Sequence, residues 1–141
     1  MNTHFIAYDL QNGYIHNWLV AGPQAIPVED LHRFQGPDFR FQIARYYYEE
    51  GSGITRVPVE SDTFAVGDGT QRWRYYRCLD DHLVDLSAFY HTYHYLRSWA
   101  YVRLKCPSAQ EVTLVLTSNG PADVWLNGRH VHRQENFSHQ L

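Results

Sequence analysis

The dipeptide Asn127-Gly128 lies between two short apolar runs in the segment SNGPADVWLNGRHVHR, residues 118–133. A two-residue β-hairpin loop of type I′ needs positive φ at both central residues, and Asn-Gly meets that need better than most pairs. An Asn-Gly pair between apolar runs is therefore the strongest short-range signal for a hairpin. The sequence predicts two antiparallel strands that meet at this turn.

The predicted two-residue loop sets the register of this hairpin. Counted outward from the loop, the predicted pairs are Leu126 with Arg129, Trp125 with His130, Val124 with Val131 and Asp123 with His132. Side chains alternate between the two faces of a strand, and paired residues share a face. One face is then apolar and is predicted to belong to the core: Val124, Leu126 and Val131. The other is polar and is predicted to be exposed: Asp123, Trp125, His130 and His132.

An exposed indole beside a carboxylate and two imidazoles is unusual, and we predict that these four residues form a ligand-binding site. A metal ion is an alternative ligand. His130 and His132 point the same way on a strand, and Asp123 could supply a third donor. A plain solvent-exposed strand, with Asp123 and His132 as an ion pair, explains the pattern without any ligand.

Three segments resemble the galactose-binding-like jelly-roll domains that accompany catalytic domains of many glycoside hydrolases. The stretch ADVWLNGRHV resembles their VWLNG hairpin, NWLVAGP at 17–23 resembles their opening strand, and residues 81–104 resemble their "D…VDLS…AYA" segment. The resemblance implies an antiparallel β-sandwich that binds a glycan without catalysing a reaction. It also implies a structural calcium ion near Asp80, Asp81 and Asp85. Apart from the resemblance, the three acids also fit the N-terminus of a helix, where negative charge is favourable.

The remaining patterns favour a mainly β chain with one or two short helices. Aromatic residues, 16% of the chain, favour strands. Helix is predicted over 37–50, with Gly51 as its stop, and helical turns are predicted in 27–34 and in the long connection 80–95. The predicted strands, with the hairpin, are 5–10, 15–20, 54–59, 73–79, 98–104 and 111–117. The first two are predicted to form a hairpin around Gln11-Asn12-Gly13, and Gly22-Pro23 is predicted to end the second.

The length of 141 residues fits a single domain, residues 1–141. In the jelly rolls that the sequence resembles, another strand or two follow this hairpin and close the sheets, whereas the sequence ends soon after it. The sandwich is thus expected to be incomplete at its C-terminus. A further region of the same protein would complete it, or a second copy of the chain would do so. The second alternative predicts a homo-oligomer. Residues 133–141, anchored by Phe137, are the predicted element of exchange.

Charge and cysteine content exclude several classes of partner. The net charge is −3, and Arg72, Arg74 and Arg77 form no continuous stripe, which argues against nucleic acid. The chain contains no signal peptide and no run of about 20 apolar residues, so a cytoplasmic protein without a membrane span is expected. Cys78 and Cys106 are predicted to be free thiols, buried or half-buried, with a single bridge as the alternative.

Two other functions remain open. A small glycan-processing enzyme would need two carboxylates about 5–10 Å apart, and the candidates are Glu49, Glu50, Asp81, Asp85 and Asp123. A protein–protein assembly module would use the aromatic surface instead. The strand aromatics are predicted either to stack on a sugar or to pack in the core: Trp73, Tyr75, Trp99 and Tyr101. His91 and His94 are a weaker pair of metal-ligand candidates, on one face of a helix.

Overall fold

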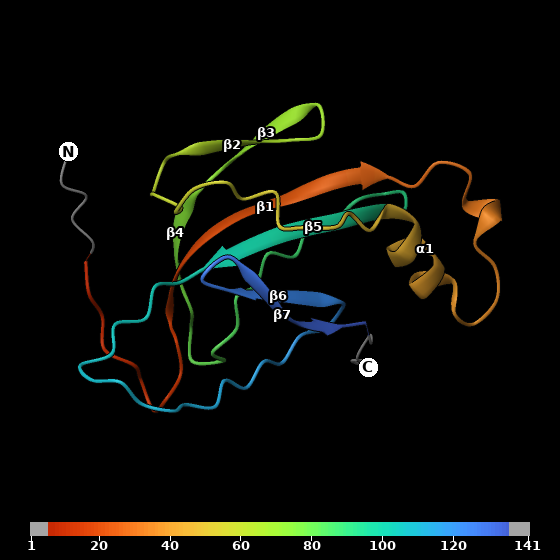
Figure 1. Cartoon of the computed structure of the whole chain (residues 1–141). Coiled ribbons are helices and arrows are strands. Elements are labelled where there is room, and N and C mark those ends of the chain that lie inside the picture. The colour runs from red at the N-terminus through yellow and green to blue at the C-terminus, as the bar shows by residue number, and fades with distance from the viewer. Residues whose placement is uncertain (1–5, 136–141) are drawn as a thin grey trace. The chain divides into compact units, whose positions relative to one another are not determined.

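The computed structural model describes residues 6–135 and is mainly β, with one short α-helix (Figure 1). The elements, in chain order, are β1 (Asn17–Pro27), the 3-10 helix η1 (Leu31–Arg33), α1 (Phe39–Tyr47), β2 (Thr63–Val66), β3 (Gly69–Arg72), β4 (Arg74–Arg77), β5 (His94–Tyr101), β6 (Ala122–Leu126) and β7 (Arg129–Gln134). No helix among residues 6–135 is long and apolar enough to cross a membrane.

The strands form three small antiparallel sheets, and none of them is closed. One has the order β4-β1-β5, and the hairpins β2-β3 and β6-β7 are the other two. The prediction of a mainly β, antiparallel fold with short helices is confirmed. The described residues show no clear two-layered sandwich.

The described chain divides into two compact units. The first comprises residues up to 24, 54–89 and 96–104, and the second comprises 25–53, 90–95 and the chain from 105 onward. Most of β1 and β5 belongs to the first unit, whereas α1 and the β6-β7 hairpin belong to the second.

The core of the first unit lies around the middle of β1. Val20 and Ala21 are completely buried, and Trp73 is 4% exposed. Trp73 stacks on Phe64 at a ring-centroid distance of 5.1 Å, and Trp99 meets Phe64 edge-on at 5.2 Å. Trp73 and Trp99 therefore pack inside this unit, as the core interpretation of the strand aromatics expects.

The predicted turn at Asn12-Gly13 is present, although the hairpin around it is not. Asn12 and Gly13 have φ of 52° and 82°, and Gln11 and Tyr14 exchange two backbone hydrogen bonds across them. Residues 6–10, however, form no strand. The turn chemistry is local, but a strand also needs a partner along its length.

Strand β1 continues to Pro27, beyond the predicted end at Gly22-Pro23. Gly22 allows this extension because β5 passes very close to it. A Cβ atom at Gly22 would lie 2.9 Å from the carbonyl oxygen of Arg97 and 3.1 Å from Cα of Ser98, both in β5. Its φ of 103° is also one that side-chain-bearing residues rarely adopt.

The predicted helix exists but is shorter than expected. It begins at Phe39 and ends at Tyr47, before the predicted stop at Gly51, and Ile43 is its buried residue. The predicted helical turns over 27–34 are reduced to η1. The connection 80–95 contains no helix, so His91 and His94 do not share a helical face.

The predicted strand over 111–117 is wrong, as is the one over 54–59. In the former segment Val112, Leu114, Val115 and Leu116 are 43–82% exposed. Its apolar side chains alternate as in a strand, but it pairs with no strand among residues 6–135. An alternating pattern of apolar residues determines which face of a strand would be apolar. Whether the strand forms depends on a neighbouring strand that accepts and donates the backbone hydrogen bonds.

Replacing Gly22 by Ala should cost more stability than replacing Gly13 by Ala. Both positions have positive φ, which costs an alanine about 1–2 kcal/mol. Only Gly22 also faces a close backbone, whereas nothing lies within 4 Å of a Cβ at Gly13; crowding of this kind adds about 1–3 kcal/mol. Urea unfolding of the two variants measures the difference, and equal losses would show that β5 does not approach β1 closely.

The two free cysteines should differ in reactivity. Burial raises the pKa of the Cys78 thiol, and the negative charge of Asp81 acts in the same direction; Cys106 is exposed. Since the thiolate is the reactive form, Cys106 should be labelled first in the folded protein near pH 8. Cys106→Ser should abolish the fast phase, and Cys78→Ser should preserve it. Equal rates for both thiols would contradict the burial of Cys78.

Candidate functional site

The turn of the β6-β7 hairpin has the predicted conformation. Asn127 and Gly128 have φ of 49° and 79°, so both central residues are left-handed, as a type I′ turn requires. Leu126 pairs with Arg129, and Trp125 pairs with His130, as predicted. The turn therefore places the indole and the first imidazole opposite each other.

Beyond these two pairs, the predicted register is wrong. The register shifts between Val124 and Trp125, so that Val124 pairs with His132 and Asp123 with Arg133. Val131 is the extra residue of this bulge, which opposes two residues of one strand to one of the other. A bulge reverses the faces of all residues that follow it, relative to a regular ladder.

The bulge changes the membership of the polar face. Paired residues share a face, so the polar face of the hairpin consists of Asp123, Trp125, His130 and Arg133. His132 lies with Val124 on the opposite face. Three of the four predicted site residues are therefore brought together, and Arg133 takes the place predicted for His132.

The apolar face does not form the predicted core. Leu126 is 63% and Val131 is 52% exposed, while Val124 is half-buried. Trp125 is also half-buried. The hairpin thus exposes side chains on both faces, and the two faces differ in chemistry more than in burial.

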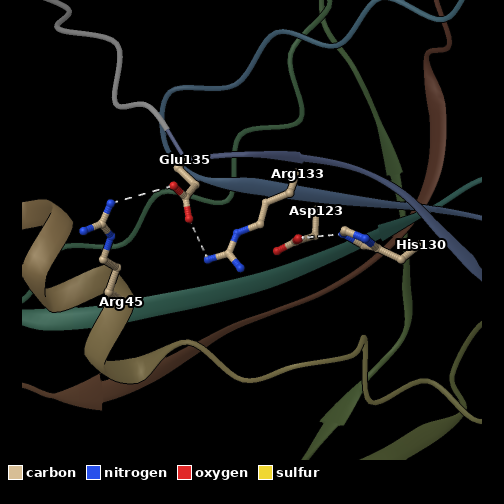
Figure 2. Close-up of polar contacts among 5 residues, drawn as sticks. All are labelled: Arg45, Asp123, His130, Arg133 and Glu135. Carbon is tan, nitrogen blue, oxygen red and sulfur yellow. Dashed lines mark hydrogen bonds and ion pairs between the residues drawn. The ribbon is translucent and has the colours of Figure 1, made fainter.

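Asp123 and His130 form the central polar contact of this face (Figure 2). The imidazole Nε2 lies 2.9 Å from Oδ1 of Asp123, and the side chains are 42% and 19% exposed respectively. Nε2–H donates this bond, so Nδ1 of the neutral ring is an acceptor. The second carboxylate oxygen is a further acceptor beside it. The indole of Trp125 meets the imidazole edge-on, with ring centroids 5.0 Å apart.

The chain after the bulge adds a second polar group to the same face. The guanidinium of Arg133 lies over the ring of Tyr48, 3.7 Å from its centroid, and 3.1 Å from Oε1 of Glu135. Arg45, on α1, lies 3.9 Å from Oε2 of the same carboxylate. Sequence reasoning missed these residues because Arg133 reaches the polar face only through the bulge, and Tyr48 and Arg45 come from a distant segment.

Two of the acids predicted to hold calcium, Asp81 and Asp85, accept hydrogen bonds in local turns. Oδ1 of Asp81 accepts a hydrogen bond from the backbone N–H of Leu83, and Oδ1 of Asp85 accepts one from Ser87. The hydrogen bonds from Ser87 lower the pKa of Asp85. Within residues 6–135, no three His, Cys, Asp or Glu side chains come together as a set of metal ligands. Neither Asp80 nor the pair of His130 and Asp123 therefore belongs to such a set within these residues.

Comparison with known proteins adds no family to this description. Neither protein-family models nor curated proteins nor solved structures give a match to the chain. The resemblance to galactose-binding-like domains therefore stays a prediction that rests on the quoted sequence segments.

Proposed function

We propose that this chain is a non-catalytic carbohydrate-binding module of the galactose-binding-like type, and that it binds a glycan on the polar face of the β6-β7 hairpin. The observation that supports this proposal best is the Asp123–His130 hydrogen bond beside the ring of Trp125. Together these groups offer one apolar surface and several directed polar atoms within a single face.

This combination suits the chemistry of a sugar ring. A pyranose has an apolar side formed by C–H groups and an edge of hydroxyl groups, so it needs a flat apolar surface and hydrogen-bond acceptors together. An indole supplies the surface and retains a polar N–H. The free carboxylate oxygen of Asp123 and Nδ1 of His130 supply adjacent acceptors for two hydroxyl groups.

The proposed fold is an antiparallel β-sandwich of the jelly-roll kind, completed by a strand from outside the described residues. The exposed segment with Val112, Leu114 and Leu116 supports this part of the proposal. In a strand paired with one from outside, these three side chains would share one face, which the opposite sheet of the sandwich would cover. A catalytic domain of the same protein would be the natural partner of such a module.

A second function, assembly with another protein chain, is favoured by the same segment. Monomeric proteins rarely leave contiguous apolar surface exposed unless it contacts a partner. We propose a second copy of this chain as that partner, in the two-fold arrangement most common among oligomers. The exchange element predicted over 133–141, with Phe137, lies mostly outside the described residues.

Trp125→Ala should weaken glycan binding much more than it lowers stability. A glycan array identifies the ligand, and titration should show at least about tenfold weaker binding, equivalent to 1.4 kcal/mol. Trp73→Ala, which truncates a buried core residue, should cost about 3–5 kcal/mol in unfolding free energy. Trp125→Ala should cost clearly less, because its side chain is only half-buried.

The matched control is His132→Ala, which removes an aromatic ring from the other face of the same hairpin and should bind normally. Leu116 is unsuitable as a core reference because it is 43% exposed. An array on which no glycan binds the wild-type protein would refute the proposed function.

Light scattering should show self-association that depends on concentration. Leu114→Arg places a charge among the exposed apolar residues and should shift the protein toward monomer. Leu79→Arg alters a residue that is 73% exposed in the other unit and should leave association unchanged. A wild-type protein that is monomeric at every concentration tested would contradict assembly through residues 111–117.

A further inference from the structure

Two arginine side chains hold one carboxylate beside the polar face (Figure 2). Oε1 of Glu135 lies 3.1 Å from Nη2 of Arg133, and Oε2 lies 3.9 Å from Nη2 of Arg45. Each oxygen of the carboxylate thus faces a different guanidinium. The arrangement is a site for a planar anion, and a side chain of the protein itself occupies it.

Arg133 makes more and closer contacts than Arg45. Its guanidinium packs on the ring of Tyr48, and its side chain is 32% exposed, compared with 70% for Arg45. Stacking on an aromatic ring fixes the plane of a guanidinium and leaves its edge free for hydrogen bonds. Because Arg133 pairs with Asp123 across the hairpin, this edge belongs to the proposed glycan face.

We propose that the glycan bound on this face carries a carboxylate, as a uronic acid does, and that this carboxylate replaces Glu135 between Arg133 and Arg45. The inference rests on the proposed glycan-binding function and names the class of sugar. A guanidinium matches a carboxylate with two parallel hydrogen bonds, which gives both affinity and orientation.

The surroundings permit this exchange. The side chain of Glu135 is 48% exposed, so it can turn toward solvent. The other acid of the face, Asp123, is only 19% exposed and directs one carboxylate oxygen toward His130.

Three trisaccharide probes test the inference on the full chain. Tri-galacturonate carries the carboxylates, its methyl ester keeps the rings but removes the charge, and a sulfated neutral trisaccharide carries an anion of different shape. Calorimetric titration should give at least about tenfold tighter binding of the acid than of the ester, as charge-assisted hydrogen bonds do. The difference should shrink in high salt.

Three variants assign the effect to the described residues. Arg133→Gln should abolish the preference for the acid over the ester. Arg129→Gln removes the same charge from the opposite face of β7 and should have no effect. Glu135→Gln should strengthen binding of the acid by roughly threefold or more, because it removes the competing carboxylate and its charge.

Each remaining outcome overturns the inference. Equal binding of acid and ester, both lost in Trp125→Ala, would refute the carboxylate and leave the glycan-binding function intact. Binding of the sulfated probe as tight as that of the acid would refute selection of a planar anion. Binding of neither galacturonate probe, while another sugar binds on the array, would refute the acidic sugar alone.

Discussion

Backbone pairing on both sides of β1 is the constraint on which the first unit depends. β1 lies between β4 and β5, so it has a partner strand along both edges. A strand with two neighbours is buried more deeply than an edge strand, and Val20 and Ala21 are accordingly inaccessible to solvent. The close approach of β5 is possible because Gly22 has no side chain at the point of contact. The absence of a side chain at Gly22 therefore permits β5 to pair closely with β1.

Features set by neighbouring residues were predictable from the sequence, whereas features set by distant partners were not. Two of the three Asn-Gly pairs, at Asn12 and Asn127, form the predicted tight turns with positive φ at both residues. The centre of α1 was also predictable, since its apolar residues recur at helical spacing. The segment 111–117 has as clear an alternation as any strand, yet it lacks a partner among the described residues. The residues of 111–117 alone do not distinguish a segment that forms a strand from one that lacks a partner.

The candidate site shows the same division within a single hairpin. The turn fixes the pairs nearest to it, so the proximity of Trp125 and His130 could be read from the sequence. The bulge at Val131 could not, because an alternating pattern looks the same with a regular ladder as with one extra residue. Its effect is large, since one added residue sends His132 to the other face and brings in Arg133. A bulge of this kind redirects side chains without altering the turn.

The polar groups of this face already have partners within the protein before any ligand binds. Asp123 is paired with His130, and Arg133 is paired with Glu135. On the proposed function, binding is then an exchange of partners, because a ligand must match the interaction that it replaces. Such an exchange limits affinity, since breaking the Arg133–Glu135 pair offsets part of the free energy that the ligand's carboxylate contributes. It also improves discrimination, because a sugar without a carboxylate leaves the Arg133–Glu135 pair intact and gains nothing from it. Selectivity on this face would thus come from the internal carboxylate as much as from the arginine it contacts.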